Sequence, residues 1–361
     1  MAVRVIIAGG GTGGHLFPGV AIAEELLRRD EKNRILFVGT NRGIEKKVLK
    51  GLGFRLKMLN VEGIKGRGMI RSLLALSKLP GSLLQSMGLI RAFRPDIVIG
   101  VGGYASGPAV LAARLMGIRT AIAEQNSIPG LTNRILGRFV DRIFISFADD
   151  GKWFPPKKTL ISGNPIRAAF FKGKPVVEKT SDKFSLLIFG GSQGAHAINQ
   201  AIQTTLPFLQ PLKGVLSIVH QTGEGDCEGM SAAYETQGFQ ARVVPFIHDM
   251  AAAYETADLL ICRAGATSIA EITAIGRAAI LIPFPYAIAD HQTENAKVLL
   301  KAGAAIMIPE KELVGSRLAD EIINLYHNPS LLKDMAKNAA NLGNIYAASD
   351  IVDSCMAILK H

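Results

Sequence analysis

The 361-residue sequence has little cysteine, few aromatic residues and no long apolar run, and each scarcity excludes a class of protein. Its three cysteines, Cys227, Cys262 and Cys355, form no C-x-x-C pair, so no zinc site or disulfide framework is indicated and a reduced compartment is expected. Aromatic residues make up 6%, which disfavours the stacking platforms of a nucleic-acid binder. No apolar run reaches the roughly 18 residues of a spanning helix, and no signal peptide is recognisable.

Acidic residues are scarce in one segment in particular. The chain carries 41 Lys and Arg against 30 Asp and Glu, a net charge of +11. Twelve of the basic residues lie between Arg42 and Arg94, where only Glu45 and Glu62 oppose them. This local excess predicts a surface for an anionic partner; a solvated basic face is the alternative.

Glycine, in contrast, is abundant and follows short apolar runs. The run 4–8 leads into Gly9–Gly14 and then a helical pattern over 17–29, and the same order recurs at 184–189, 190–195 and 196–206. Runs typical of buried parallel strands fill the intervals: they cover 34–38, 96–101, 120–123, 142–145, 216–220, 241–244, 259–262 and 279–282. The pattern predicts an α/β chain of two Rossmann-like domains.

The stretch from Thr159 to Lys183, which is rich in Gly, Pro and charge, is the expected junction. We predict an N-terminal domain over 1–163 and a C-terminal domain over 164–343. In the remaining segment, 344–361, the expected helix 348–359 could belong to either domain, and a return to the first is the prediction.

The first glycine loop has the spacing of a dinucleotide site, G-x-G-x-x-G, at Gly9, Gly11 and Gly14. A nicotinamide site also needs an acid at the end of the second strand, and the letters there, FVGTNR, contain none. A dehydrogenase is therefore disfavoured. The second loop, at 190–195, is the better diphosphate site, because backbone N–H groups at a helix N-terminus bind phosphate. A tight turn is the alternative for a glycine loop of this kind.

Two downstream stretches add polar groups. Glu271 lies in CRAGATSIAEITAIG and suits the paired hydroxyls of a ribose, although an acid in the first turn of the helix 266–275 would also favour the helix dipole. The letters DHQTEN, at 290–295, follow a strand end and suit the hydroxyls of a sugar. An ordinary N-cap with a solvated first turn is the alternative.

Nine stretches together carry a family resemblance: GGGTGGHLFPGVAIAEEL, GVGGYASGP, EQNSIPGLTNR, GNPIR, GGSQGAHAIN, HQTGEGD, PFIHDMAAAY, CRAGATSIAEI and PFPYAIADHQTENA. They span Gly9 to Ala296 in order, and they resemble the MurG family of N-acetylglucosaminyltransferases of peptidoglycan synthesis. The resemblance implies a GT-B fold, two Rossmann-like domains facing across a cleft. It also implies inverting transfer of N-acetylglucosamine from UDP-N-acetylglucosamine to the 4-hydroxyl of MurNAc in lipid I, giving lipid II.

A helix N-terminus can stabilise the leaving diphosphate without a metal, and the sequence has no D-x-D carboxylate pair in a strand-end loop, so we expect neither a metal nor a cofactor. The resemblance also implies the residues of the donor site. Ser192 and Gln193 face the diphosphate, the backbone of Ile247 takes uracil, and Glu271 takes the ribose. The other implied donor residues are Thr12, Gly13, Gly14, Asn126, Arg167, Ala266, Thr267, Ser268, Gln292 and Asn295.

On the acceptor side, the resemblance implies Gly11, Tyr104 and Asn133. Inversion needs a base for the acceptor hydroxyl, and His15 is the prediction with Glu124 as its rival. A His15 that only donates to phosphate or caps the loop is the alternative. The sequence departs from the family at Ala123, where a histidine is usual, and at DHQTEN, where some members have adjacent glutamines.

The basic segment mixes cations with apolar bulk, which predicts contact with an anionic membrane surface rather than a plain helix packed on the sheet. The residues concerned are Met69, Ile70, Arg71, Leu73, Leu74 and Lys78. We therefore expect a peripheral protein on the cytoplasmic face of the cell membrane, with lipid I as partner and no nucleic acid. Family membership implies association with cell-wall and division proteins. The rival functions are a UDP-N-acetylglucosamine 2-epimerase, another GT-B glycolipid synthase, or a non-enzymatic nucleotide- or nucleic-acid-binding protein.

Overall fold

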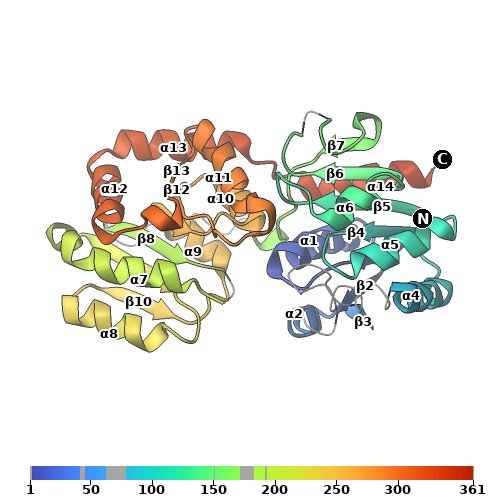
Figure 1. Cartoon of the computed structure of the whole chain (residues 1–361), viewed down its shortest axis with the longest axis horizontal. Helices are drawn as coiled ribbons and strands as arrows, with labels where there is room; N and C mark the ends of the chain where they lie inside the picture. Colours follow the sequence, from blue (N-terminus) through green and yellow to red (C-terminus); the bar gives the residue numbers. More distant parts are fainter. Residues whose placement is uncertain are drawn as a thin grey trace. The chain divides into compact units, whose positions relative to one another are not determined.

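The computed structural model describes residues 2–40, 45–61, 79–149, 151–170, 183–191 and 193–360. The chain divides into two compact units (Figure 1): unit 1 is Met1–Ala168 with Asn344–His361, and unit 2 is Ala169–Gly343. Ser192 and the six residues predicted to touch a membrane, from Met69 to Lys78, lie outside the described residues.

Unit 1 is built on one parallel seven-stranded sheet in the order β3-β2-β1-β4-β5-β6-β7. The strands are β1 (Arg4–Ala8), β2 (Arg34–Thr40), β3 (Arg55–Leu59), β4 (Ile97–Gly100), β5 (Arg119–Glu124), β6 (Arg142–Ile145) and β7 (Thr159–Ile161). The helices are α1 (Gly13–Arg29), α2 (Glu45–Gly51), α4 (Leu79–Phe93), α5 (Ser106–Leu115), α6 (Leu131–Leu136) and α14 (Ala347–Leu359), with a 3₁₀ turn at Pro156–Lys158. A further 3₁₀ turn, Ala168–Phe170, spans the boundary between the two units.

Apolar residues cover both faces of this sheet, as a buried parallel sheet requires. Val5 and Ile7 of β1 enter a core with α1 and α14, while Ile6 enters the core under α5 on the other face. The side chains alternate between the faces because a strand has a period of two. Strands whose residues are apolar in succession therefore fill two cores at once.

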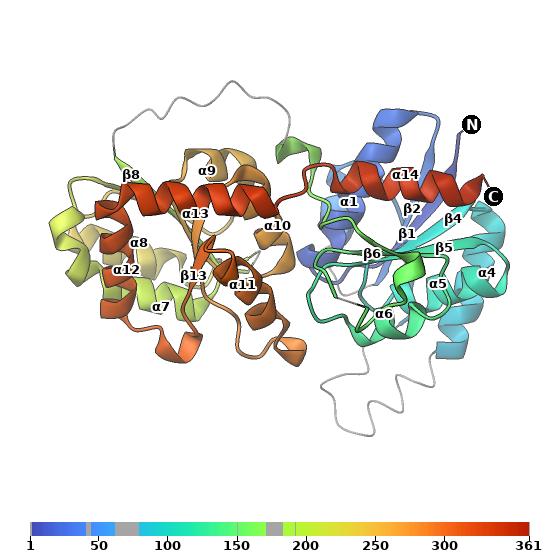
Figure 2. The same ribbon diagram turned by 90° about the horizontal axis from the view of Figure 1, so that it is seen from above.

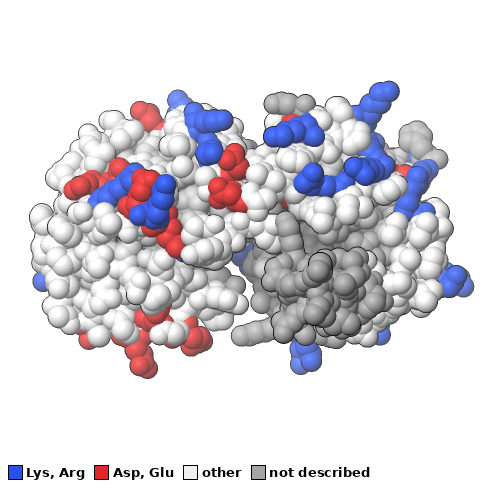
Figure 3. Space-filling model, viewed as in Figure 1, with Lys and Arg blue, Asp and Glu red and all other residues white. Residues whose placement is uncertain are grey.

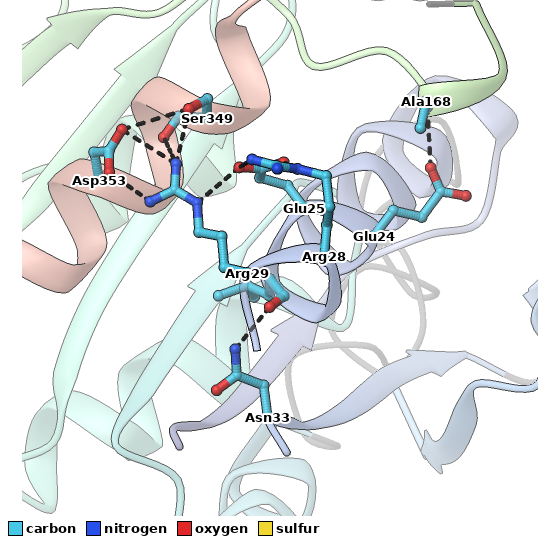
Figure 4. Close-up of polar contacts among 9 residues, drawn as sticks. Glu24, Glu25, Arg28, Arg29, Asn33, Ala168, Ser349 and Asp353 are labelled. Atoms are coloured by element: carbon cyan, nitrogen blue, oxygen red, sulfur yellow. Dashed lines mark hydrogen bonds and ion pairs between the residues drawn. The ribbon is translucent and has the colours of Figure 1, made fainter. Parts of the chain in front are cut away.

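The last helix of the chain, α14, lies along α1 in unit 1 (Figure 2). Ile351 and Cys355 are buried in the same core as Ile7. The Arg29 guanidinium, at the end of α1, forms an ion pair with Asp353 and donates to the Ser349 carbonyl at 3.0 Å (Figure 4). Unit 1 is thus completed by residues almost 180 positions beyond its main segment.

Unit 2 repeats the plan with six parallel strands in the order β10-β9-β8-β11-β12-β13. They are β8 (Phe184–Phe189), β9 (Leu216–Gln221), β10 (Ala241–Val244), β11 (Leu259–Cys262), β12 (Ala278–Leu281) and β13 (Ala305–Met307). The helices are α7 (His196–Thr205), α8 (Cys227–Gln237), α9 (Met250–Thr256), α10 (Ala266–Ile275), α11 (His291–Lys301), α12 (Gly315–His327) and α13 (Pro329–Leu342), with 3₁₀ turns at Leu206–Leu212, Ile288–Asp290 and Glu310–Glu312.

Each sheet has a point where the strand order reverses. In unit 1 the chain moves from β1 to β2 and β3, and then returns to the other side of β1 with β4. In unit 2 the same reversal falls between β8 and β11. Ligands of open α/β sheets bind outside the carboxyl ends of the strands at such points. The two glycine loops follow β1 and β8, and each of these strands lies at one of the points where the strand order reverses.

The predicted helix at 17–29 is wrong at its start, because α1 already begins at Gly13. Thr12, extended at φ −132° and ψ 162°, is the N-cap, so Gly13, Gly14 and His15 form the first turn. Glycine lowers helix propensity but does not forbid a first turn, where packing decides. His15 is therefore a helical residue rather than a loop residue.

Candidate functional site

At the switch point of unit 1, the loops after β1 and β4 lie against each other. Gly102 has φ +88°, and a Cβ on it would come within 2.6 Å of Cδ2 of His15. Only glycine allows this approach, so the backbone after β4 forms one wall of the His15 site. Thr12 Oγ1 lies 3.4 Å from His15 Nδ1, and Tyr104, on the same β4 loop, is 48% exposed. The structure thus brings Thr12, His15 and Tyr104 to one sheet edge.

A buried acid that sequence reasoning missed lies beneath the first glycine loop. The Gly11 N–H donates to Oε1 of Glu45 at 2.7 Å, and Glu45, the first residue of α2, is 0% exposed. A carboxylate at that N–H occupies a donor that a phosphate would need. The first loop is therefore a poor dinucleotide site, as the missing ribose acid indicated. The one signal in the sequence is that Glu45 stands alone among basic neighbours.

Glu124, at the end of β5, organises the loop that leads to α6. Its Oε1 accepts from Asn126 N at 3.0 Å and Nδ2 at 3.3 Å, and its Oε2 accepts from Gly130 N at 3.0 Å and Asn133 Nδ2 at 2.9 Å. Glu124 and Asn133 are each 3% exposed. Both carboxylate oxygens hold backbone or amide donors. Glu124 therefore ties Asn126, Gly130 and Asn133 to the end of β5.

Arg167 follows β7 and lies in unit 1, with its guanidinium 4.4 Å from the Phe17 ring centroid on α1. The residues predicted to act from unit 1 are therefore attached to the carboxyl ends of β1, β4, β5 and β7. These ends share one edge of the sheet, because all its strands are parallel.

In unit 2, the second glycine loop and α10 flank the switch point between β8 and β11. Gln193 is exposed in the loop, and Ala195 and Gly265 are the N-caps of α7 and α10, so neither helix has a capping side chain at that position. Helix N-termini of this kind suit an anion. Ala266, Thr267 and Ser268 form the first turn of α10.

Glu271 lies in the second turn of α10, and the helix has no acid in its first turn. The dipole alternative for Glu271 is therefore wrong, since that effect falls off within the first turn. The side chain is 7% exposed, and its Oε2 accepts from the Tyr254 hydroxyl at 3.1 Å. Thr267 and Glu271, four residues apart, share one face of the helix. A buried carboxylate held by a phenol is suited to fixed hydroxyl partners.

The sugar-binding candidates lie at the start of α11. Gln292 Oε1 accepts from Phe284 N at 3.0 Å, whereas Asn295 is 0% exposed and its Nδ2 lies 3.4 Å from the Ala264 carbonyl. Gln292 is therefore the more accessible of the two, and Asn295 ties α11 to the loop before α10. Ile247, after β10, is 6% exposed, and only its backbone can form a hydrogen bond, because its side chain has no polar atom.

Arg263 is a further residue that sequence reasoning missed. Its Nη1 donates to the carbonyls of Ile282 and Pro283 at 3.3 Å each, and its guanidinium lies 5.3 Å from the Phe284 ring centroid. It also forms an ion pair with Glu310. Arg263 therefore fixes the segment whose Phe284 N–H holds Gln292.

Within the described ranges, no three His, Cys, Asp or Glu side chains gather as metal ligands would. Among the same residues, none of the helices combines the length and apolarity that crossing a bilayer requires.

Two parallel α/β units, each with a glycine loop at its switch point, are consistent with the two-domain GT-B fold. The chain belongs to glycosyltransferase family 28, because it matches the N-terminal domain of that family over residues 5–145 and the C-terminal domain over 185–353.

Similar proteins support the assignment to this family. The UDP-N-acetylglucosamine–N-acetylmuramyl-(pentapeptide) pyrophosphoryl-undecaprenol N-acetylglucosamine transferase of Syntrophus aciditrophicus strain SB is 82% identical over 360 residues, with 100% of each chain covered. The crystal structure of MurG from Acinetobacter baumannii has a TM-score of 0.78 at 33% identity and covers 97% of this chain and 98% of its own. A UDP-GlcNAc 2-epimerase from Neisseria meningitidis has a TM-score of 0.65 at 14% identity, covering 99% of this chain and 100% of its own, which is a likeness of fold alone.

Proposed function

We propose that this glycosyltransferase moves N-acetylglucosamine from UDP-N-acetylglucosamine to the 4-hydroxyl of MurNAc in lipid I, with inversion, to give lipid II. The observation that carries the proposal is the donor edge of unit 2, where the second glycine loop, the first turn of α10 and Glu271 surround one switch point. The 82% identity to a transferase with this activity in its name supports the same substrates.

The donor roles proposed here are those that the family resemblance implies. The N–H groups of the loop at 190–195, with Ser192 and Gln193, hold the diphosphate, and the backbone of Ile247 takes uracil. Glu271, whose Oε2 also accepts from the Tyr254 hydroxyl, accepts from the ribose hydroxyls. Gln292 contacts the sugar, and Asn295 acts by holding α11 in place. Thr12, Gly13, Gly14, Asn126 and Arg167 supply the remaining donor contacts.

In the chemical step, His15 removes the proton of the 4-hydroxyl while that oxygen attacks the anomeric carbon. The bond from the anomeric carbon to the UDP oxygen breaks at the same time, and UDP leaves with the bonding electrons. Backbone N–H groups and helix N-termini stabilise the charge that develops on the diphosphate. Gly11, Tyr104 and Asn133 orient the acceptor. No metal enters this scheme.

Unit 1 also carries features that support contact with an anionic membrane. Leu131, Ile135 and Phe139 are 50–57% exposed, and Arg134 and Arg138 lie between them in the sequence. Unit 1 contains 27 Lys and Arg against 13 Asp and Glu, and unit 2 contains 14 against 17. On the face in Figure 3, blue side chains prevail over unit 1. We propose a peripheral position on the cytoplasmic face of the membrane, with cell-wall and division proteins as further partners.

The activity is tested by incubating the purified chain with radiolabelled UDP-N-acetylglucosamine and a lipid I analogue. The expected product is a labelled disaccharide lipid. Label that stays in the nucleotide pool as UDP-N-acetylmannosamine would support the epimerase, and a lack of labelled lipid contradicts the proposal.

Membrane contact is tested by co-sedimentation with vesicles that contain increasing phosphatidylglycerol. Binding is expected to rise with anionic lipid and to weaken between about 0.05 and 0.5 M salt, because salt screens exposed charges. Arg138→Glu is expected to weaken binding, and Lys333→Glu on α13 of unit 2 is the matched charge reversal that leaves it unchanged. Binding that ignores lipid charge and salt contradicts the electrostatic part.

A further inference from the structure

Asp226, between β9 and α8, directs its carboxylate away from its own helix. It is the N-cap of α8, yet its side chain makes no capping hydrogen bond there. Such a residue usually accepts from its own first turn. Instead, Asp226 accepts from Asn199 Nδ2 at 2.6 Å and from His196 Nδ1 at 3.0 Å, both on α7. These bonds, that of Asn199 first, hold the pKa of the Asp226 carboxyl below its ordinary value.

The Asn199 amide can adopt only one orientation. Burial lowers the pKa of His220 to about 3, so its ring is neutral at pH 7. The Thr222 carbonyl and the Asp226 carboxylate can only accept, so the amide nitrogen of Asn199 faces them and donates at 2.9 and 2.6 Å. Asn199 Oδ1 then faces His220 Nε2 at 3.0 Å, so Nε2 carries the proton and His220 Nδ1 accepts from the Tyr234 hydroxyl at 3.0 Å.

This network meets the second glycine loop at Thr222. Gly194 has φ +76°, and a Cβ on it would lie 1.8 Å from the Thr222 carbonyl oxygen. The loop backbone therefore rests directly on the turn that Asn199 and Asp226 hold. His196 is the first residue of α7, so its bond to Asp226 fixes the other end of the same loop.

We propose that Asp226 is a positioning residue for the donor diphosphate. Acting through Asn199 and His196, it holds the loop at 190–195 and the N-terminus of α7 in the arrangement that presents their N–H groups to the diphosphate. The inference rests on the proposed function, in which this loop binds that group. The uridine part of the donor contacts α10 and Ile247 instead, so it does not depend on Asp226.

The test compares dissociation constants for UDP and uridine, measured by calorimetry, in the full chain and in Asp226→Ala. The expected result is a rise of about tenfold in the UDP constant, as for loss of one charge-assisted hydrogen bond, with the uridine constant unchanged. In turnover assays the donor KM rises while kcat at saturating donor stays within about twofold. Glu228→Gln, an exposed acid of α8, is the control and behaves as the wild type.

His196→Ala provides a second variant, because its ring is exposed and its loss leaves the buried part of the network intact. A UDP constant about threefold higher, with uridine unchanged, is expected there. UDP affinity equal to wild type in both variants overturns the inference, as does an equal loss for UDP and uridine. A wild-type chain that binds no UDP contradicts the proposed function instead.

Discussion

At the scale of single residues, His15 and Glu124 differ in how accessible their side chains are. Glu124 is 3% exposed, and four N–H donors reach its two oxygens. His15 is half-buried in the first turn of α1, with its ring beside the Gly102 backbone. The proton that a base removes must be able to reach it, so we propose His15 as the base and Glu124 as the residue that shapes the β5–α6 loop.

His15→Ala is expected to lower kcat by roughly 10²-fold or more, as for the loss of a general base, with the donor KM little changed. Glu124→Gln places an amide NH₂ against N–H donors, so we expect a lower melting temperature and a higher acceptor KM. Steady-state kinetics with both substrates varied separates the two. Near-normal kcat in a folded His15→Ala protein would rule His15 out as the base.

His220 predicts a dependence of stability on pH. Its pKa is about 3 in the folded chain and about 6.5 when unfolded. Between these values the unfolded state binds the extra proton. The contribution of the neutral His220 ring to the free energy of unfolding is therefore complete above about pH 6.5. On acidification the free energy of unfolding falls by up to about 1.4 kcal/mol per pH unit.

In His220→Gln the unfolded state no longer takes up this proton. The difference in the free energy of unfolding between the wild type and the variant should therefore become smaller from pH 7.5 to pH 4.5. The sole tryptophan, Trp153, lies in unit 1, so unfolding of unit 2 is best followed by hydrogen exchange in β9 peptides. A gap that stays constant across this range contradicts the assignment.

At the scale of elements, the two glycines of the second loop make a matched pair. Gly194→Ala drives a methyl group into the Thr222 carbonyl, whereas a Cβ at Gly191, with φ +97°, meets no atom within 4 Å. We expect Gly191→Ala to cost about 1–2 kcal/mol from backbone conformation alone. Gly194→Ala adds displacement of the loop and should abolish measurable UDP binding. Thermal melts and UDP titrations check both, and equal effects of the two variants would be contrary to expectation.

Elements with strong local signals were predictable from the sequence. The strands β1, β6, β8, β10 and β11 and the helix α10 have the predicted limits, because each is a short apolar run or a run bounded by glycines. The edge strands β3 and β13 and the short β7 were not predicted. The residues of β3 alternate between exposed and partly buried, so they lack the continuous apolar run of a central strand.

The positions of Gly11, Glu124 and Glu271 near the carboxyl ends of strands were predictable, because they follow from chain order. The contacts that hold those residues were not. Glu45 is 34 residues from Gly11, and Asp226 is 27 from Asn199, so only the fold brings each acid to its partner. Residue type and local spacing do not predict such pairs, because an exposed acid and a buried acid that accepts hydrogen bonds from a distant residue have the same letter in the sequence.

At the scale of the whole molecule, unit 1 is assembled from both ends of the chain. The main segment ends at Ala168, and α14 returns to bury Ile351 and Val352 in its core. Unit 2 is a single continuous segment with its own core. Because each unit has a separate core, each has its own stability, and a single unfolding free energy does not describe the chain.

Ligand binding is expected to separate the two stabilities. UDP at about 100 times its dissociation constant stabilises the state that binds it by about 2.7 kcal/mol. The residues to which the diphosphate, uracil and ribose are assigned, namely Ser192, Gln193, Ile247 and Glu271, all lie in unit 2. Circular dichroism, which follows both units, should therefore show the transition of unit 2 at a higher temperature when UDP is present. The fluorescence of Trp153, which reports unit 1, should keep its midpoint. Removal of residues 347–361 should instead destabilise unit 1, because it uncovers the core around Ile351. The Trp153 midpoint should then fall, while unit 2 still binds UDP. If UDP raises both midpoints equally, either unit 1 also binds the nucleotide or the two units unfold together. In either case the proposal that UDP stabilises unit 2 alone is wrong.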